Sequence, residues 1–224
     1  MYLVNTISGD SLGREYAVMK KNSSIRALFL DIGGVLLTDG WTKASRDLAS
    51  KKFNLNPEET EKRHSEAFDT VELGKSTLEE YFNRVIFYEK RSFTREQFRK
   101  FMFSQSKPYP KMIELVRNLK AKYGLKTVVV SNEGRELNAY RIKKFKLDKL
   151  VDFFVSSSFV HFRKPDEDIF KLALDCAQTP VRQIAYIENT PMFVHIADGL
   201  GIRGILHKDY DSTRAKLASL GLSE

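Results

Sequence analysis

The 224-residue chain contains a single cysteine, Cys176, so it cannot form a disulfide within itself. One cysteine suits a reducing compartment, and we expect a cytoplasmic location. The chain also lacks any apolar run close to the roughly 20 residues that a membrane-spanning helix needs. Its first residues lack a charged start followed by an apolar stretch, so we expect neither a signal peptide nor an association with membranes.

A basic block that would bind nucleic acid is also missing, although lysine and arginine outnumber aspartate and glutamate by 37 to 29. The basic residues are spread through several predicted helices, and aromatic residues do not interleave with them in a compact cluster. We interpret the formal net charge of +8 as that of a solvated surface, and expect no nucleic-acid partner. Hydrophobic residues make up 42% of the chain, which argues against a disordered protein.

A short apolar run that ends in an aspartate organises the rest of the sequence. Residues 27–30 read Ala-Leu-Phe-Leu and lead directly into Asp31. The run has no helical period, which is typical of a strand buried on both faces. Gly33 and Gly34 indicate a sharp turn where the strand ends. Asp31 is therefore expected at the carboxyl end of a central strand, where open α/β sheets bind their ligands.

From residue 41 to residue 106 the pattern is helical and amphipathic, with no strand signal. Three helix starts carry a capping residue, namely Asn56, Ser76 (spaced from Glu79 as a capping box) and Thr94 (spaced likewise from Gln97). The core of this segment is expected to contain its aromatic residues, Trp41, Phe68, Phe82 and Phe98 among them. Several helices with no strand between them predict a small helical insertion after the first strand, well placed to act as a lid.

From residue 107 onward, predicted strands and helices alternate. The strands are expected over residues 125–130, 151–155, 183–187 and 202–206, and the helices over residues 111–123, 133–145, 166–177, 190–199 and 211–220. This alternation predicts an α/β fold with a doubly wound, mainly parallel sheet. The predicted domains are an N-terminal extension over residues 1–24, an α/β core over residues 25–40 and 107–224, and a helical cap over residues 41–106.

Polar residues stand where four of the predicted core segments end. They are Asp31, the pair Ser131-Asn132, Lys164, and the pair Glu188-Asn189. Because strand ends in a parallel sheet share one edge, these groups can converge. Two carboxylates, a hydroxyl and a lysine suit phosphoryl transfer to an aspartate, with Asp31 as the nucleophile and with Ser131 and Lys164 on the phosphoryl oxygens. Magnesium between the carboxylates would let the anionic nucleophile approach an anionic phosphate.

The order of these segments resembles that of the haloacid dehalogenase (HAD) superfamily, whose members are mostly phosphatases. The resemblance runs from about Ile25 to the C-terminus. Four motifs carry it, namely Asp31-Ile32-Gly33-Gly34-Val35-Leu36, Val129-Val130-Ser131-Asn132, Arg163-Lys164-Pro165-Asp166 and Tyr186-Ile187-Glu188-Asn189. The resemblance implies a Rossmann-like core, with the helical insertion as the small α-helical cap of one branch of the family.

The resemblance also implies an activity, that of a phosphoric monoester hydrolase. Asp31 would attack phosphorus and form an aspartyl-phosphate. Ser131 and the backbone of Asn132 would hold the phosphoryl group, and Lys164 would steady both that group and Asp31. The expected substrate is a small phosphorylated metabolite. The sequence determines neither the identity of this substrate nor the oligomeric state.

The metal that the resemblance implies is Mg²⁺. It would bind Asp31, the main-chain carbonyl of Gly33, and the fourth motif with Glu188 and Asn189. The family's phosphatases usually carry a pair of aspartates in the fourth motif. Glu188 has a longer side chain than aspartate and Asn189 is neutral, so the expected affinity for Mg²⁺ is lowered.

A second departure concerns the general acid and base. The family's phosphatases usually carry an aspartate at the position of Gly33, and general acid–base help is worth roughly 10²–10⁴ in rate. Asp39, just past the turn, is interpreted as a solvated loop residue, with a role as substitute acid as the alternative. Two further hypotheses therefore stand beside the phosphatase: a catalytically weak or inactive binding or regulatory protein, and a metal-independent, dehalogenase-like hydrolase that acts at carbon.

Overall fold

A five-stranded, all-parallel sheet with the strand order β3-β2-β1-β4-β5 forms the centre of the computed structural model, which describes residues 24–224. The strands are β1 (Ala27–Leu30), β2 (Lys126–Ser131), β3 (Phe153–Ser156), β4 (Ile184–Glu188) and β5 (Arg203–Leu206). The predicted parallel α/β fold is therefore confirmed. The predicted N-terminal extension lies outside the described residues, except for its last residue.

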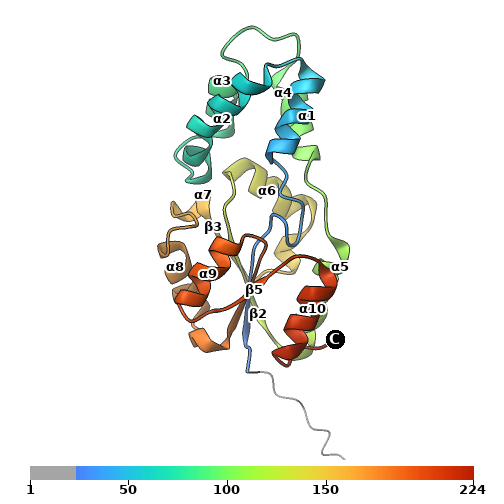
Figure 1. The fold of residues 1–224 in the computed structure, drawn as a ribbon, viewed down its shortest axis with the longest axis vertical. Coiled ribbons are helices and arrows are strands. Elements are labelled where there is room, and N and C mark those ends of the chain that lie inside the picture. The colour runs from blue at the N-terminus through green and yellow to red at the C-terminus, as the bar shows by residue number, and fades with distance from the viewer. Residues whose placement is uncertain (1–23) are drawn as a thin grey trace, which may run out of the picture.

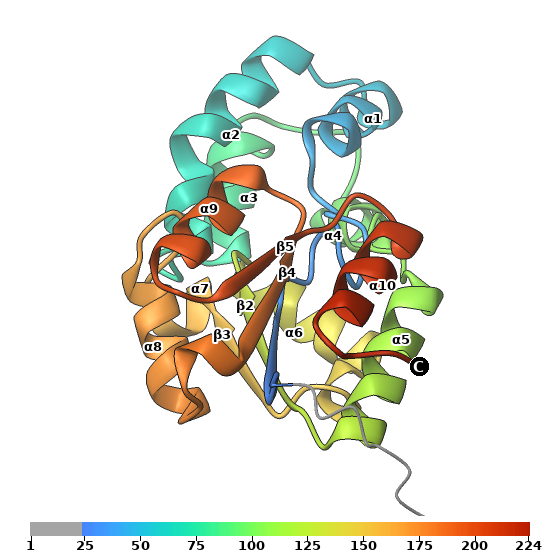
Figure 2. The same ribbon diagram turned by 60° about the horizontal axis from the view of Figure 1, so that its bottom comes forward.

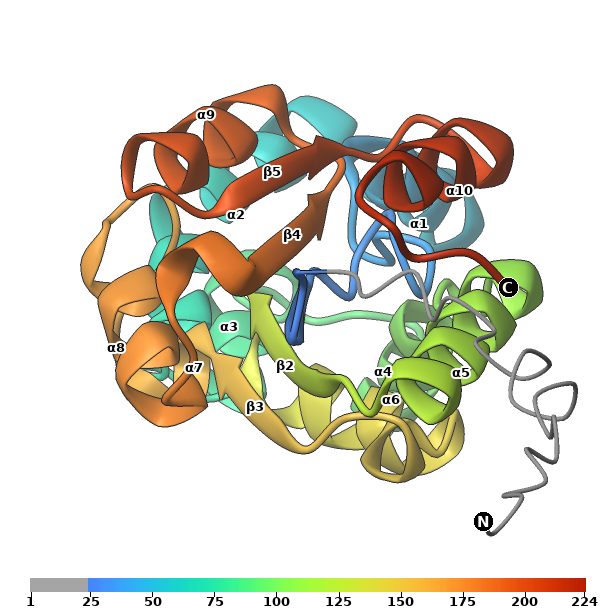
Figure 3. The same cartoon turned by 90° about the horizontal axis from the view of Figure 1, so that it is seen from below.

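Helices cover both faces of the sheet (Figures 2 and 3). One layer contains α5 (Pro110–Tyr123), α6 (Arg135–Lys144) and α10 (Tyr210–Ser219), with the 3₁₀ turn η1 (Leu147–Lys149). The other contains α7 (Ser157–Val160), α8 (Asp168–Ala177) and α9 (Pro191–Gly199), with η2 (Val181–Gln183) leading into β4. Within residues 24–224, we find no helix with the length and apolarity needed to cross a membrane.

The two layers explain the apolar run before Asp31. Leu28 and Leu30 belong to the hydrophobic cluster that includes residues of α5 and α10. Ala27 and Phe29 belong to the cluster that includes residues of α8 and α9. Because alternate side chains of a strand point to opposite faces, a strand covered on both faces is apolar at every position. Asp31 follows at the point where this covered strand ends.

The segment between β1 and α5 folds into four helices, which stand at the end of the molecule toward which the strands run (Figure 1). They are α1 (Lys43–Phe53), α2 (Pro57–Glu72), α3 (Leu78–Val85) and α4 (Arg95–Ser104). The aromatic side chains of Trp41, Phe82 and Phe98 are buried together in a hydrophobic cluster of this insertion. The insertion therefore has its own apolar core and lies over the carboxyl edge of the sheet.

One predicted helix start is wrong by a single residue. The capping box of α3 consists of Thr77 and Glu80, and the predicted pair of Ser76 and Glu79 does not form it. The Ser76 hydroxyl instead accepts hydrogen bonds from Thr70 at 3.1 Å and from Arg84 at 3.0 Å. The predicted caps of α2 and α4 both form as expected.

A buried arginine fixes the two connections between the core and the insertion. Arg141 on α6 donates to the Asp39 carbonyl at 2.7 Å and to the Ser106 hydroxyl at 3.0 Å, one contact on each connection. Its guanidinium also forms a buried ion pair with Glu133. The connections are joined directly as well, since the Thr38 amide donates to the Lys107 carbonyl at 2.8 Å. These contacts set the position of residues 38–40 relative to the strand ends.

Candidate active site

Asp31 lies at the carboxyl end of β1 with its carboxyl group buried beneath the helical insertion. The residue is 8% exposed, and its Oδ1 atom lies 3.2 Å from the Nζ atom of Lys164. Oδ1 accepts no hydrogen bond of good geometry from the described residues. Burial raises the pKa of Asp31 to about 6, although the Lys164 ammonium and the Ser131 hydroxyl both oppose this rise. The carboxylate is therefore anionic at neutral pH and poorly solvated, as a nucleophile should be.

Lys164 is the cation at the centre of the site. Its side chain is 1% exposed, and Nζ lies 2.6 Å from Glu188 Oε2 and 3.0 Å from the Tyr186 hydroxyl. Burial alone would lower the pKa of this lysine, but the carboxylates of Asp31 and Glu188 outweigh burial and raise it above its ordinary value. Lys164 therefore carries a positive charge at neutral pH next to the Asp31 carboxylate.

Ser131 and Asn132 follow β2 on the same edge of the sheet. Ser131 is buried and lines the cavity above Asp31. The Asn132 side chain holds the backbone of Lys164: its Oδ1 accepts from the Lys164 amide and its Nδ2 donates to the Lys164 carbonyl, each at 2.8 Å. The Asn132 side chain therefore positions Lys164, and the phosphoryl contact of the Asn132 backbone stays a prediction.

Glu188 is fully buried, and donors surround its carboxylate. Oε2 accepts from Lys164 at 2.6 Å and from the Tyr186 hydroxyl at 2.5 Å, and Oε1 accepts from the Thr190 amide at 2.8 Å. Burial and the Glu188 charge both raise the pKa of Tyr186 well above its ordinary value, so this hydroxyl keeps its proton and remains a donor. Glu188 is thus held in one place, mainly as the partner of Lys164.

The Asn189 amide lies where the fourth motif meets the turn after β1. One terminal atom of the amide lies 3.2 Å from the Gly33 carbonyl oxygen and 2.9 Å from Glu188 Oε1. With the amide nitrogen at that place, Asn189 donates two hydrogen bonds. This approach requires Gly34, which has φ +71°, because a Cβ atom there would lie 2.1 Å from the Asn189 amide group. The glycine pair of the first motif is thus partly explained by a contact with the fourth.

The same arrangement suits the ligands of an Mg²⁺ ion when the amide is turned over, so that the Asn189 oxygen takes the place of its nitrogen. With the Asn189 oxygen there, three oxygens converge, and neighbouring ligands of an octahedral Mg²⁺ with bonds of about 2.0–2.1 Å lie about 3 Å apart. The described residues contain no cluster of three acidic, histidine or cysteine side chains that could hold a metal. The spacing of the three oxygens fits Mg²⁺. Two of the three are carbonyl and amide oxygens, however, and these bind Mg²⁺ more weakly than carboxylates do.

Asp31, Ser131 and Lys164 open onto a cavity of about 310 Å³ between the sheet edge and the insertion. The lining includes side chains from the insertion that did not stand out as site residues in the sequence, namely Trp41, Thr42, Phe68 and Glu72. Trp41 and Phe68, expected as part of the core of the insertion, thus also form part of the cavity wall. Arg163 lines the cavity from the core and pairs with Glu72 at 2.8 Å and with Asp69 at 2.6 Å. Burial raises the pKa of Glu72, and Arg163 opposes this rise.

Two further residues line the cavity: Glu133, which was missed, and Asp39, whose role as substitute acid was only the alternative interpretation. Glu133 is buried against Arg141, and burial raises its pKa to about 7. Its position directly after Ser131-Asn132 was the sequence signal that could have indicated a place in the site. Asp39, interpreted as a solvated loop residue, is exposed but also lines the cavity. Burial of its carboxyl group raises its pKa, and Arg141 opposes the rise.

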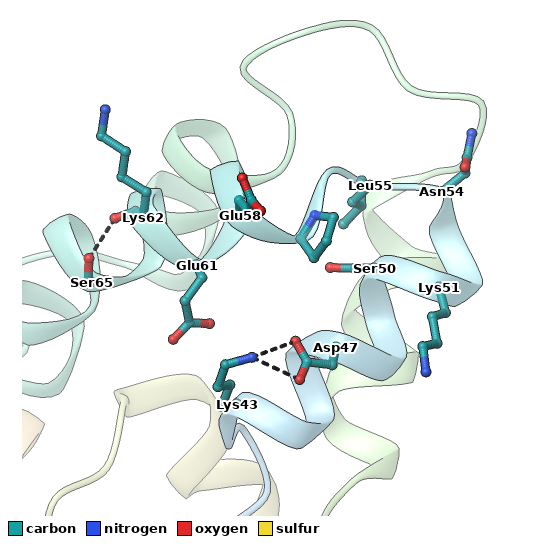
Figure 4. Close-up of a pocket in the computed structure, with 11 residues that line it drawn as sticks. Lys43, Asp47, Ser50, Lys51, Asn54, Leu55, Glu58, Glu61, Lys62 and Ser65 are labelled. Atoms are coloured by element: carbon teal, nitrogen blue, oxygen red, sulfur yellow. Dashed lines mark hydrogen bonds and ion pairs between the residues drawn. The ribbon is translucent and has the colours of Figure 1, made fainter.

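A larger hollow of about 800 Å³ lies elsewhere, between α1 and α2 of the insertion (Figure 4). Charged side chains line it, and they pair locally or face solvent. Lys43 and Asp47, for example, form an exposed ion pair at 3.0 Å. None of the groups around Asp31 reaches this hollow. The smaller cavity, where buried charged groups converge, is therefore the candidate active site.

The family is decided by a sequence model of haloacid dehalogenase-like hydrolases, which matches residues 25–192. The chain belongs to this family. The matched range contains the first strand, the helical insertion and all four motifs. The resemblance seen in the sequence is therefore confirmed, and the chain is a HAD-like hydrolase.

Two curated proteins are similar to this HAD-like hydrolase in sequence. A protein of Caldanaerobacter subterraneus subsp. tengcongensis named pyrophosphatase PpaX is 30% identical over 103 residues, which are 45% of this chain and 47% of that protein. Bifunctional epoxide hydrolase 2 of Sus scrofa is 24% identical over 217 residues, 87% of this chain and 38% of that protein. The matches thus span less than half the length of each relative.

Solved structures support the fold. A HAD-like family hydrolase from Porphyromonas gingivalis superposes with a TM-score of 0.73 at 17% identity, covering 90% of this chain and 100% of that one. A HAD family enzyme from Bacteroides thetaiotaomicron, in complex with magnesium and inorganic phosphate, gives 0.69 at 20% identity, covering 82% and 94%. L-2-haloacid dehalogenase from Xanthobacter autotrophicus, with chloropropionic acid covalently bound, gives 0.59 at 13% identity, covering 89% and 85%. At these identities the likeness concerns the fold alone.

Proposed function

We propose that this HAD-like hydrolase is a phosphatase that acts on a small phosphorylated metabolite through an aspartyl-phosphate on Asp31. The observation that carries the proposal is the buried pair of Asp31 and Lys164, 3.2 Å apart beneath a cavity of about 310 Å³. The carboxylate supplies a nucleophile, and the ammonium offsets negative charge where a phosphoryl group would lie. A relative named as a pyrophosphatase and a structural neighbour that binds magnesium and phosphate support the same chemistry.

The reaction has two steps. In the first, an Asp31 oxygen attacks phosphorus while the bond from phosphorus to the leaving oxygen breaks, and that oxygen takes up a proton. Lys164 and the Ser131 hydroxyl hold the phosphoryl oxygens during this transfer. In the second step, a water molecule attacks the phosphorus of the aspartyl-phosphate, which releases phosphate and restores the Asp31 carboxylate. Every turnover therefore passes through a phosphorylated Asp31, which the second step returns to the free carboxylate.

The proposed cofactor is Mg²⁺. Asp31, the Gly33 carbonyl and the Asn189 amide oxygen would hold it, with Glu188 beside them. When bound, it neutralises negative charge between the nucleophile and the phosphoryl oxygens. The chain's own contribution is to keep Glu188 fixed through Lys164 and the Thr190 amide, so that only the Asn189 amide must turn to admit the metal.

The proposed function is tested by measuring phosphate release from a panel of small phosphomonoesters, with and without Mg²⁺. We expect Mg²⁺-dependent release from at least one substrate, and no release by the Asp31→Asn variant. Release by the variant at the wild-type rate would disprove the role of Asp31. Failure to release phosphate from any substrate, together with failure to bind Mg²⁺ in calorimetry, would favour the alternative of an inactive binding or regulatory protein.

Asn189→Asp is expected to increase the affinity for Mg²⁺ by roughly tenfold or more, because a carboxylate adds a negative charge and cannot donate to the Gly33 carbonyl. Isothermal calorimetry of Mg²⁺ binding to the purified protein measures this directly. Asn56→Asp is the matched control, since it makes the same change at the exposed cap of α2, where aspartate also caps well. Equal affinities for the wild type and Asn189→Asp would show that Asn189 does not face the metal.

One observation favours a second candidate, a metal-independent hydrolase that acts at carbon. With the amide nitrogen of Asn189 facing Gly33 and Glu188, hydrogen bonds satisfy the fourth motif without a metal. Lys164 and the Ser131 hydroxyl then favour the ionised form of Asp31. Halide release from 2-haloacids by protein stripped of metal is the deciding measurement. Halide release without any phosphatase activity would replace the first proposal with this one.

A further inference from the structure

Four carboxyl side chains line the cavity, and three of them are paired with a basic side chain. The pairs are Asp31 with Lys164, Glu72 with Arg163, and Glu133 with Arg141. Asp39 is the fourth, and among residues 24–224 no lysine or arginine lies within ion-pairing distance of its carboxylate. It is therefore the lining carboxyl that forms no ion pair with a basic side chain among these residues.

The Asp39 carboxyl lies against the turn that follows Asp31. Its Oδ1 atom is 3.0 Å from the place that a Cβ atom on Gly33 would take, and the Cα atom of Asp39 is 3.4 Å from the same place. Gly33 is two residues from Asp31 in the same turn. The absence of a side chain at Gly33 thus leaves room for the Asp39 carboxyl in the turn after Asp31, and both carboxyl groups line the same cavity.

The backbone of Asp39 is fixed as well. Its carbonyl accepts from Arg141 at 2.7 Å and from the Trp41 amide at 3.1 Å. The neighbouring Thr38 is tied through its amide to Lys107 at 2.8 Å. These contacts hold the residue at the cavity wall, while its exposed side can exchange protons with solvent between turnovers.

We propose that Asp39 is the general acid and base of the phosphatase reaction, a role that rests on the proposed function. In the first step the Asp39 carboxyl gives its proton to the leaving oxygen as that oxygen takes the electron pair of the breaking bond to phosphorus. In the second step the Asp39 carboxylate takes a proton from the water that attacks the phosphorus. The proton gained in the second step replaces the one lost in the first, so the cycle balances.

The test compares Asp39→Asn with the wild type on substrates whose leaving groups differ. On an alkyl phosphate, whose alkoxide needs a proton, kcat/KM is expected to fall roughly 10²- to 10⁴-fold. On p-nitrophenyl phosphate, whose leaving group is stable as an anion, kcat/KM is expected to change little. Slow attack by water should then produce a burst of nitrophenol and a phosphorylated protein that can be isolated after an acid quench.

Two further variants separate a chemical role from a structural one. Asp47→Asn is the matched control, because Asp47 lies on α1 in an exposed ion pair outside the cavity, and we expect wild-type rates. Asp39→Glu keeps the carboxyl group and is expected to recover part of the loss on the alkyl phosphate. Melting temperatures of all the variants show whether each one is folded.

Several outcomes would overturn the proposal. If Asp39→Asn loses the same factor on both substrates and accumulates no phosphorylated protein, Asp39 only positions other groups. If its rates equal those of the wild type, Asp39 has no part in the reaction. In both cases phosphate release by the wild type stands, so the phosphatase proposal survives. A wild-type protein that releases no phosphate from any substrate would overturn both proposals together.

Discussion

Asp31→Asn is expected to lower phosphate release from every substrate of the wild-type protein by roughly 10⁴-fold or more, as loss of a nucleophile does in other hydrolases. The neutral amide is a much weaker nucleophile than the carboxylate, and it cannot form the acyl-phosphate that the proposed mechanism requires. The measurement is steady-state phosphate release, together with the amount of label that an acid quench traps on the protein during turnover of a ³²P-labelled substrate.

The control for this substitution is Asp211→Asn, the same change at an exposed position of α10. This variant should keep both the wild-type rate and the wild-type amount of trapped label. Label that still appears on Asp31→Asn would place the phosphorylated residue elsewhere. Activity that survives without any trapped label in either protein would indicate direct attack by water.

Lys164→Met is expected to destabilise the protein by about 3–5 kcal/mol, as breaking a buried ion pair does. Glu188 is fully buried, and both it and Asp31 would lose the one cation between them. Methionine fills a similar volume, so the loss reports charge rather than a cavity. Urea unfolding at pH 7, followed by circular dichroism, gives the free energy of unfolding for each variant.

Two comparisons make this result specific. Lys171→Met removes a lysine from an exposed ion pair with Glu167 and should cost no more than about 1 kcal/mol. The double variant Lys164→Met with Glu188→Gln removes one uncompensated charge and should recover part of the stability. A cost for Lys164→Met as small as that for Lys171→Met would mean that the buried carboxylates do not depend on this lysine.

The insertion is the part of the cavity wall that we expect to select the substrate. Phe68 and Glu72 come from α2, and Arg163, beside the proposed phosphoryl-binding Lys164, joins α2 to the core through Glu72 and Asp69. A hydrogen bond between His161 Nδ1 and the Leu73 carbonyl, at 2.8 Å, joins the same two segments. The end of α2 is thus fastened to the loop that carries Lys164, so substrate contacts and the lysine are positioned together.

The sequence by itself determined the features that depend on local patterns. The apolar run into Asp31 predicted a strand covered on both faces, because burial on two sides permits no polar position. The caps at Asn56 and Thr94 were predicted because a cap and the amide it accepts from lie within one turn. The four motifs could be found because each is a contiguous segment, and the parallel order of the strands then requires their ends to share one edge.

Only the tertiary structure decided the contacts between residues far apart in the chain. Arg141 reaches Asp39 across 102 positions. No local pattern marks Arg141 as part of the site, and Asp39 stands out only as an alternative acid because it follows the turn closely. The contact of Asp39 with the space beside Gly33, and that of Asn189 with Gly34, depend on side-chain packing between separate loops. Local periodicity places a residue on an element, but which loops meet above the strand ends depends on how the whole chain packs. That packing decides which carboxyl group lies against the turn after Asp31.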